Sequence, residues 1–292
     1  MIKQTFLIGL IAATTAISAQ KDSTKTFVKN IFTSTQVVNA QTTEVLPKKS
    51  WEFKIQHRFG KIGLDSSLVQ DFLGMDHTAN IRIAFGYSFS DRFYMAVGRT
   101  KVLKTYDFEG KYLLMKQTKE QKFPLSIALY ANAAIRTERF PNIPDSAYFG
   151  DWSTDFYYKP SHRLAYNTQI IFSSKINDAI SLQLTPILIY ENLVGPDLEN
   201  HTMALSFSGR FKTGLNSSIL FEYGHVLNIR TNGFVNPASL AYEIGTSGHA
   251  FSFFITSSQS ILEQRIYTNS SYDYGNAEFI LGFSIKRNFW RK

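Results

Sequence analysis

Residues 80–98 decide the fold, and they read NIRIAFGYSFSDRFYMAVG. Apolar residues occupy every second position before Ser90-Asp91 and again after it, with small or polar residues between them. A period of two places alternate side chains on opposite faces of an extended chain. This stretch therefore predicts two β-strands joined by a turn of about two residues.

The same alternation recurs along most of the chain. It begins where Trp51, Phe53 and Ile55 alternate with charged and polar residues, and it is still clear at residues 279–286. Counting each alternating run as one strand predicts about twelve strands. The apolar face of each run continues for about ten residues, the length with which a tilted strand crosses a bilayer.

The connections between the predicted strands alternate in length. The longest are expected near residues 60–78, 137–161 and 258–278, and between them lie short turns such as Asn177-Asp178. A soluble sandwich has no reason to keep such a rhythm, whereas outer-membrane barrels have short periplasmic turns on one rim and long extracellular loops on the other. The chain is therefore predicted to be all-β, a closed antiparallel transmembrane β-barrel of about twelve strands.

Aromatic residues gather at the predicted strand ends, where interfacial girdles of membrane barrels lie. They are Trp51, Tyr87, Phe89, Phe93, Tyr190, Tyr223, Phe289 and Trp290. Backbone groups in hydrocarbon must all be paired, so such a sheet has to close. Alternation alone also fits a soluble sandwich whose apolar faces meet in a core, and this alternative stays open.

Several short segments carry a family resemblance. They are His57-Arg58-Phe59-Gly60, Gly74-Met75-Asp76, Ala79-Asn80-Ile81-Arg82, Gly98-Arg99, Gly248-His249-Ala250-Phe251 and Lys286-Arg287-Asn288-Phe289. With them the chain resembles, over residues 42–290, an uncharacterised family of outer-membrane barrels from Gram-negative bacteria of the Bacteroidota type, classed as a domain of unknown function. It departs from that family at Thr246-Ser247-Gly248-His249, where the family has Thr-Gly-Gly-His. The resemblance implies a barrel of similar kind and brings no established activity.

The N-terminal 49 residues differ from the rest of the chain. Lys3, the apolar residues 6–17 and Ser18-Ala19-Gln20 together predict a secretory signal peptide over residues 1–19, cleaved near Ala19. Its apolar stretch of about twelve residues is too short to span a bilayer as a helix. Residues 20–49 are polar without a settled period and are expected to form an N-terminal periplasmic leader segment, followed by the barrel over residues 50–292.

Composition excludes several chemistries. The 292 residues include 31 Lys plus Arg, 23 Asp plus Glu and no Cys, so disulfides, thiolate nucleophiles and Cys-based zinc sites are ruled out. The six histidines lie far apart, and nucleotide-binding or hydrolase motifs are absent, so no metal, no cofactor and no catalytic residue is expected. The positive charges are dispersed, which fits outer-membrane lipid or lipopolysaccharide as partners better than nucleic acid.

Charged residues on the polar strand faces are predicted to line the lumen. They are Glu52, Lys54, Arg58, Arg82, Glu109, Lys111, Arg136, Arg163, Glu191, Arg210, Glu222, Glu243 and Lys286, eight positive and five negative groups. If these charges pair across the lumen, they form a polar plug. If a passage remains, the positive surplus favours anionic solutes.

The leading functional expectation is a non-enzymatic narrow channel or binding barrel for small solutes, with anionic ones favoured. Two alternatives belong to other classes of protein. One is a structural or partner-docking barrel with a plugged lumen, in which loop aromatics would meet the partner; these are Phe140, Tyr148, Phe149, Trp152, Phe156, Tyr157 and Tyr158. The other is a lipid-modifying enzyme, which needs a histidine and a hydroxyl or carboxylate together at one rim.

Overall fold

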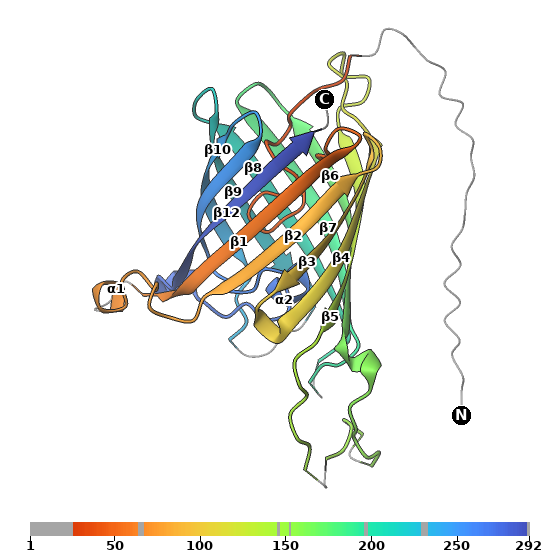
Figure 1. Cartoon of the computed structure of the whole chain (residues 1–292), viewed down its shortest axis with the longest axis vertical. Helices are drawn as coiled ribbons and strands as arrows, with labels where there is room; N and C mark the ends of the chain where they lie inside the picture. Colours follow the sequence, from red (N-terminus) through yellow and green to blue (C-terminus); the bar gives the residue numbers. More distant parts are fainter. Residues whose placement is uncertain are drawn as a thin grey trace, which may run out of the picture.

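A computed structural model describes residues 26–63, 67–144, 147–151, 153–195, 198–228 and 233–290. The predicted signal peptide and Trp152 lie outside these residues. Within them, twelve strands form one closed barrel in which each strand pairs antiparallel with its neighbours in sequence and the first pairs with the last (Figure 1). The predicted all-β closed barrel is therefore confirmed.

The strands are long enough to cross a bilayer, and their bounds follow in chain order. They are β1 (Ser50–Ile62), β2 (Asn80–Ser88), β3 (Phe93–Thr100), β4 (Thr105–Met115), β5 (Ser126–Arg136), β6 (Leu164–Lys175), β7 (Ile180–Glu191), β8 (His201–Lys212), β9 (Ser217–Val226), β10 (Ala238–Gly245), β11 (His249–Thr256) and β12 (Phe279–Trp290). The described helical turns are α1 (Ser67–Gln70), η1 (Val102–Lys104), η2 (Pro160–Arg163), α2 (Glu263–Ile266) and η3 (Tyr274–Asn276). None of the helices in the described residues has the length and apolar character needed to cross a membrane.

The two faces of the strands are inverted relative to a soluble protein. Phe85 and Phe253 are 55% and 63% exposed on the outer wall, whereas Lys54 and Lys111 are fully buried inside the barrel. A continuous apolar outer wall is unfavourable in water and favourable in hydrocarbon. The soluble sandwich, in which these apolar side chains would form a core, is therefore excluded.

Both ends of the barrel-forming chain lie at the same rim, which we call the termini rim (Figure 1). Aromatic rings form a chain of contacts there: Trp51 with Tyr87 at 4.6 Å between centroids, Tyr87 with Phe89 at 4.8 Å, and Phe89 with Phe93 at 5.8 Å. Such a belt is typical of the membrane–water interface. The opposite end, with the longest connections, is the long-loop rim.

The alternation of connection length holds except at one point. Residues 101–104 make a short turn at the long-loop rim, and the next connection, 116–125, is longer although it lies at the termini rim. The longer connection has a structural use, because it pairs with the incoming N-terminal chain. Val28 N donates to Gln117 O at 2.9 Å, and Lys119 N donates to Thr26 O at 2.9 Å.

Candidate functional site: the occluded lumen

Residues 30–46 form a hairpin inside the barrel, which we call the lumen hairpin. This differs from the expected periplasmic leader: the chain pairs with the 116–125 turn, enters the lumen, and leaves it again where Lys49 N donates to Ser88 O at 2.8 Å. Both ends of the hairpin therefore lie at the termini rim. Its tip is a tight turn in which Val37 N donates to Ala40 O at 2.8 Å.

The sequence of the hairpin suits a polar interior. Residues 30–43 contain no charged side chain and are rich in Thr, Gln and Asn, and the one acid of the hairpin, Glu44, accepts the Phe32 N–H at 3.3 Å. Asn30 adopts a left-handed conformation, with φ 55°, at the turn into the lumen. Ser34 Oγ donates to Gln36 O at 2.7 Å and Thr42 Oγ1 to Ser34 O at 2.7 Å, so short hydroxyl side chains satisfy the backbone locally.

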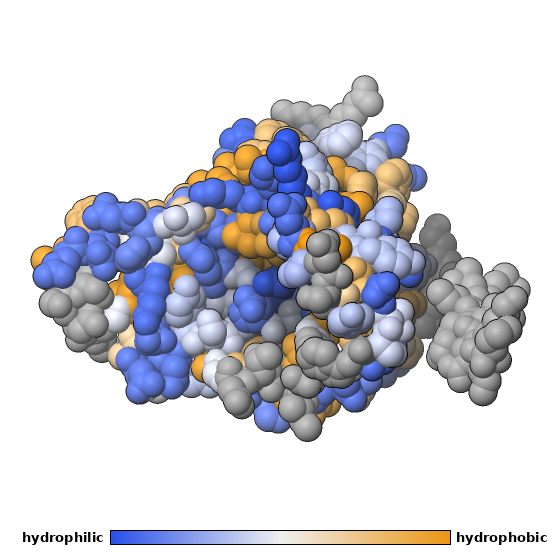
Figure 2. Space-filling view, turned by 90° about the horizontal axis from the view of Figure 1, so that it is seen from below, coloured by the Kyte–Doolittle hydropathy of each residue, from blue (hydrophilic) through white to orange (hydrophobic). Residues whose placement is uncertain are grey.

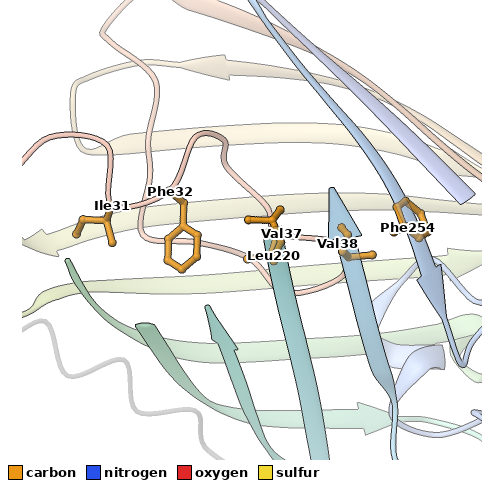
Figure 3. Close-up of a cluster of buried hydrophobic side chains, with 7 residues drawn as sticks. Ile31, Phe32, Val37, Val38, Leu220 and Phe254 are labelled. Atoms are coloured by element: carbon orange, nitrogen blue, oxygen red, sulfur yellow. The ribbon is translucent and has the colours of Figure 1, made fainter. Parts of the chain in front are cut away.

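A small apolar cluster supports the hairpin (Figure 3). Its members are Ile31, Phe32, Val37 and Val38 from the hairpin and Leu220, Ala241 and Phe254 from β9, β10 and β11, all buried. The contact to the wall is therefore apolar on one side of the lumen. On another side Val45 of the hairpin packs against Leu113, Ala128, Tyr130 and Ile171, and the other contacts of the hairpin are polar.

Four cations of the barrel wall bind oxygen atoms of the hairpin. Lys111 Nζ donates to Thr35 O at 2.6 Å, and Lys286 Nζ donates to Gln36 O at 2.5 Å and Val37 O at 3.2 Å. Arg210 Nη2 donates to Asn30 O at 3.1 Å. Arg58 donates to the side-chain oxygen of Asn39. The carbonyl groups of the hairpin thus take the place that the oxygen atoms of an anion would occupy.

Two wall carboxylates bind several donors of the same hairpin, and a third, Glu243, lies 3.3 Å from the Ser34 hydroxyl. Glu222 accepts the backbone N–H groups of Asn39 and Ala40 at 3.0 Å and of Val38 at 3.3 Å. Glu52 accepts the Thr35 hydroxyl at 2.8 Å. The hairpin is therefore held through its backbone by both signs of lumen charge, and hydrogen bonds to charged partners are the stronger kind.

A second network joins the charges of β1 to β5 to one another. Lys54 pairs with Glu109, and Arg82 Nε donates to Asp107 Oδ1 at 3.0 Å. Tyr130 OH also donates to Glu109 at 3.0 Å. These groups are all buried, and each charge has an opposite partner, which offsets part of the cost of removing it from water.

Gly86 makes room for the ring of Tyr94 on the inner surface of the barrel wall. A Cβ at Gly86 would lie 2.1 Å from Tyr94 Oη, so the Tyr94 side chain lies directly over the glycine backbone. From there Tyr94 OH donates to Glu52 at 2.6 Å. The glycine is required by this close approach rather than by its backbone angles.

The β11–β12 connection closes the lumen from the other side. Residues 257–270, which we call the inner loop, fold into the barrel, and Ile266 and Tyr267 pack with Ile187 and Ile189 of β7. Arg58 Nη1 donates to Ser258 O at 2.7 Å, so one arginine binds both the inner loop and the lumen hairpin. Seen from the long-loop rim, this end of the molecule is largely hydrophilic (Figure 2).

Little space remains between the two inserted segments. The cavity between the lumen hairpin and the inner loop is about 10 Å³, and Gln36, Gln56 and Gln264 contribute to its lining. A cavity of this size holds at most about one water molecule. The described lumen is therefore closed to solutes.

The predicted lumen charges divide into two groups. The structure buries ten of them inside the barrel: Glu52, Lys54, Arg58, Arg82, Glu109, Lys111, Arg210, Glu222, Glu243 and Lys286. Arg136, Arg163 and Glu191 lie instead at the long-loop rim and are half-buried, because β5 and β7 end at Arg136 and Glu191 and η2 contains Arg163. Asp107 was missed, although it shares the strand face of Glu109.

Two histidines lie beside a carboxylate at the long-loop rim, which is the pairing that the lipid-modifying alternative requires. His77 pairs with Asp71 at 3.2 Å and His201 with Glu199 at 3.3 Å, each in or beside a long-loop-rim connection. In the part of the chain that is described, no group of three or more His, Asp or Glu side chains could hold a metal ion.

The architecture defines a class of protein, a transmembrane β-barrel whose lumen is closed by its own chain. The protein belongs to the family described as a membrane bound beta barrel domain (DUF5777), which matches residues 32–289. No curated protein matches the chain.

Several solved outer-membrane barrels resemble the structure. The NanC porin has a TM-score of 0.50 and 5% sequence identity over 82% of this chain and 100% of that one. The KdgM porin in complex with disordered oligogalacturonate has a TM-score of 0.48 and 8% identity over 82% and 99%, respectively. The COG4313 outer membrane channel from Pseudomonas putida F1 has a TM-score of 0.48 and 11% identity over 85% and 98%. At these identities the likeness shows the fold alone, a porin-like outer-membrane barrel.

Proposed function

We propose that this protein is a non-enzymatic outer-membrane channel for small solutes that the lumen hairpin and the inner loop close, and that opens when the hairpin withdraws through the termini rim and the inner loop moves aside at the long-loop rim. The main support for the proposal is the set of contacts between the hairpin and the barrel wall. Its backbone is bound by side chains of the wall, and both of its ends leave through the same rim. Withdrawal therefore needs no break in the barrel.

The same contacts support a preference for anions in the open state. Without the hairpin, Arg58, Lys111, Arg210 and Lys286 would lose the oxygen atoms they bind and would face the bore. Wall cations in a narrow, low-dielectric pore favour anionic solutes.

A reversible cross-link tests the proposal. The hydroxyl groups of Thr43 in the hairpin and Ser173 in β6 are in direct contact, and the natural chain has no cysteine. A Thr43→Cys, Ser173→Cys variant should therefore form a disulfide without large backbone movement. We expect the oxidised variant to be silent in planar bilayers and the reduced variant to show anion-selective conductance like that of the unmodified protein, with each single variant as a control.

A structural or partner-docking barrel is the second candidate, and the closure of the lumen from both sides favours it. It predicts no conductance from the unmodified, oxidised or reduced protein. Absence of conductance from all three would contradict the channel, and cation preference would contradict the anionic solute.

We also propose that the chain is cleaved near Ala19 and resides in the outer membrane of a Gram-negative bacterium of the Bacteroidota type. There its outer wall would contact lipid and lipopolysaccharide.

A further inference from the structure

A cavity of about 500 Å³ opens at the long-loop rim, apart from the closed lumen. It lies between the β5–β6 connection, the β7–β8 connection and the inner loop. One wall is apolar and includes Phe149, Phe156, Leu193 and Val194. The two phenylalanine rings contact each other at 5.0 Å in an edge-to-face arrangement, so this wall is fixed before any ligand arrives.

The polar side of the cavity contains Arg136, Glu191 and Arg265. Arg136 is already paired with Glu138. The neighbouring Arg163 donates to the carbonyl groups of Arg136 at 3.1 Å and Glu138 at 2.6 Å. Arg136 and Arg163 are therefore engaged by the protein itself.

Arg265 differs from them. Its guanidinium makes no ion pair and no hydrogen bond among the residues that the structure describes, although its Nε, like that of Arg136, is buried. Burial lowers the pKa of Arg265; Glu191 and Glu138 act in the opposite direction, and Arg136 adds to the lowering. A buried donor without an acceptor is unfavourable, and an acceptor supplied by a ligand would remove that cost.

We propose that this cavity binds a small organic carboxylate with a ring or branched apolar body. The carboxylate lies on the guanidinium of Arg265, whose planar fork matches carboxylate geometry. The apolar body lies against Phe149, Phe156, Leu193 and Val194. The volume is within the usual range for small-molecule sites.

The surroundings favour a singly charged ligand over an inorganic polyanion. Glu191 lines the same cavity and would repel a second negative charge. A phosphate or sulfate would also leave the aromatic wall unused. The inference deepens the proposed channel function and rests on it, since it names the class of solute captured at the channel mouth.

Ligand-observed fluorine NMR on the full mature chain in detergent tests the site. The probe is 4-fluorophenylacetate, and 4-fluorophenylacetamide has the same shape without the charge. We expect the acid to bind and the amide to bind at least about tenfold more weakly, as loss of a charge-assisted hydrogen bond implies. Equal binding of the two probes, or no binding of the acid, would overturn the proposal.

Variants locate the binding. Arg265→Gln should weaken binding of the acid to the level of the amide, and Arg265→Lys should give an intermediate affinity because it keeps the charge without the fork. Arg139→Gln removes an exposed arginine of the same β5–β6 connection and should leave binding unchanged. Unchanged binding by a folded Arg265→Gln variant would contradict the site. If that variant does not fold, the comparison of the acid and the amide on the unmodified protein still tests the proposed site.

The binding measurement and the conductance measurement separate the two proposals. Selective binding of the acid by a protein that never conducts would retain the site and remove the channel. Conductance from a protein that does not distinguish the two probes would retain the channel and remove the site.

Discussion

Glu222 is the residue on which the tip of the lumen hairpin depends most. Its carboxylate accepts three consecutive backbone N–H groups, from Val38 to Ala40. In a Glu222→Gln variant the negative charge is lost. One carboxylate oxygen is replaced by an NH2 group, which cannot accept the backbone N–H groups of residues 38–40. Because a hydrogen bond to a charged group contributes about 1.5–3 kcal/mol, we expect the amides of residues 38–40 to exchange with deuterium about ten- to a hundredfold faster.

Glu243 provides the matched control for this prediction. It is a buried acid on the neighbouring strand β10, but the contact it makes with the hairpin is a single hydrogen bond from Ser34 Oγ, at 3.3 Å. Glu243→Gln should therefore change exchange at residues 38–40 much less than Glu222→Gln. Equal effects of the two substitutions would show that general loss of lumen charge, and not the contacts of Glu222, holds the tip.

Glu263 makes docking of the inner loop depend on pH. Burial raises the pKa of its carboxyl group, and the nearby Glu222 and Glu109 raise it further, whereas the nearby Gln169 amide and Lys111 lower it. The protonated acid is therefore favoured in the docked loop. Its contribution is fully present below the pKa of the unfolded chain and is lost as the pH rises through the raised value.

We accordingly expect the inner loop to loosen in alkaline solution. The measurement is the deuterium exchange of residues 257–270 in the unmodified protein relative to Glu263→Gln at each pH, because this ratio cancels the intrinsic pH dependence of exchange. The ratio should rise with pH. Glu199→Gln, which changes an exposed acid in another loop, should leave the pH dependence in place, and a flat ratio would contradict the assignment to Glu263.

At the residue scale, strand parity predicted which charges point inward but not how far along the barrel they lie. A period of two assigns Lys54 and Lys111 to the inner face whatever the strand ends are. Depth depends on where a strand ends, and alternation near Arg136 and Glu191 does not show this. Asp107 could have been found, since it precedes Glu109 by two positions on the same face.

At the element scale, the lumen hairpin was beyond prediction from local pattern. Its arms have no period, because they pair mainly with wall side chains instead of with a sheet. Asn39, for example, meets Glu222 and Ser239, which are distant in sequence. The signal that was available is the uncharged, polar run of residues 30–43 in a chain that otherwise carries dispersed charge.

The hairpin should behave as a separable element. Residues 47–49 are exposed at the termini rim, so a specific protease site inserted between Lys48 and Lys49 can be cut after the barrel has assembled. Because the hairpin is held by hydrogen bonds and two small apolar clusters, we expect the cut protein to stay closed and to open in mild denaturant. Bilayer conductance before and after the denaturant pulse is the measurement.

The opened barrel should be closed again by a hairpin peptide, and only from one side of the membrane. A synthetic peptide of residues 26–48 should close the opened barrel when added at the termini rim and have no effect from the long-loop rim, because its N-terminal end pairs with the 116–125 connection at the termini rim. A peptide of scrambled order is the control. Closure from both sides, or by the scrambled peptide, would mean that the peptide blocks the bore without adopting the hairpin contacts.

At the scale of the whole molecule, one inversion governs the fold: charge is buried and apolar surface is exposed. In water this arrangement would be unfavourable on both faces. In a bilayer the wall is solvated by hydrocarbon, and the inner charges are satisfied by one another and by the hairpin. Sequence alternation reveals the two faces, whereas the identity of the surrounding solvent follows from strand length and rim aromatics.

Two phenylalanines of similar exposure test which solvent surrounds the wall. Phe85 lies in the middle of β2 and is 55% exposed, and Phe89 follows the same strand at the termini rim and is 51% exposed. In a bilayer, lysine costs about 2–4 kcal/mol at the midplane and about 0–1 kcal/mol near the interface. Phe85→Lys should therefore lower the free energy of unfolding from lipid vesicles by the larger amount and Phe89→Lys by the smaller, measured by urea titration. If water surrounded the wall, both substitutions would be nearly neutral. If another protein layer covered it, each substitution would lower the free energy of unfolding according to its own contacts. Only hydrocarbon makes the cost of each substitution depend on its depth in the bilayer.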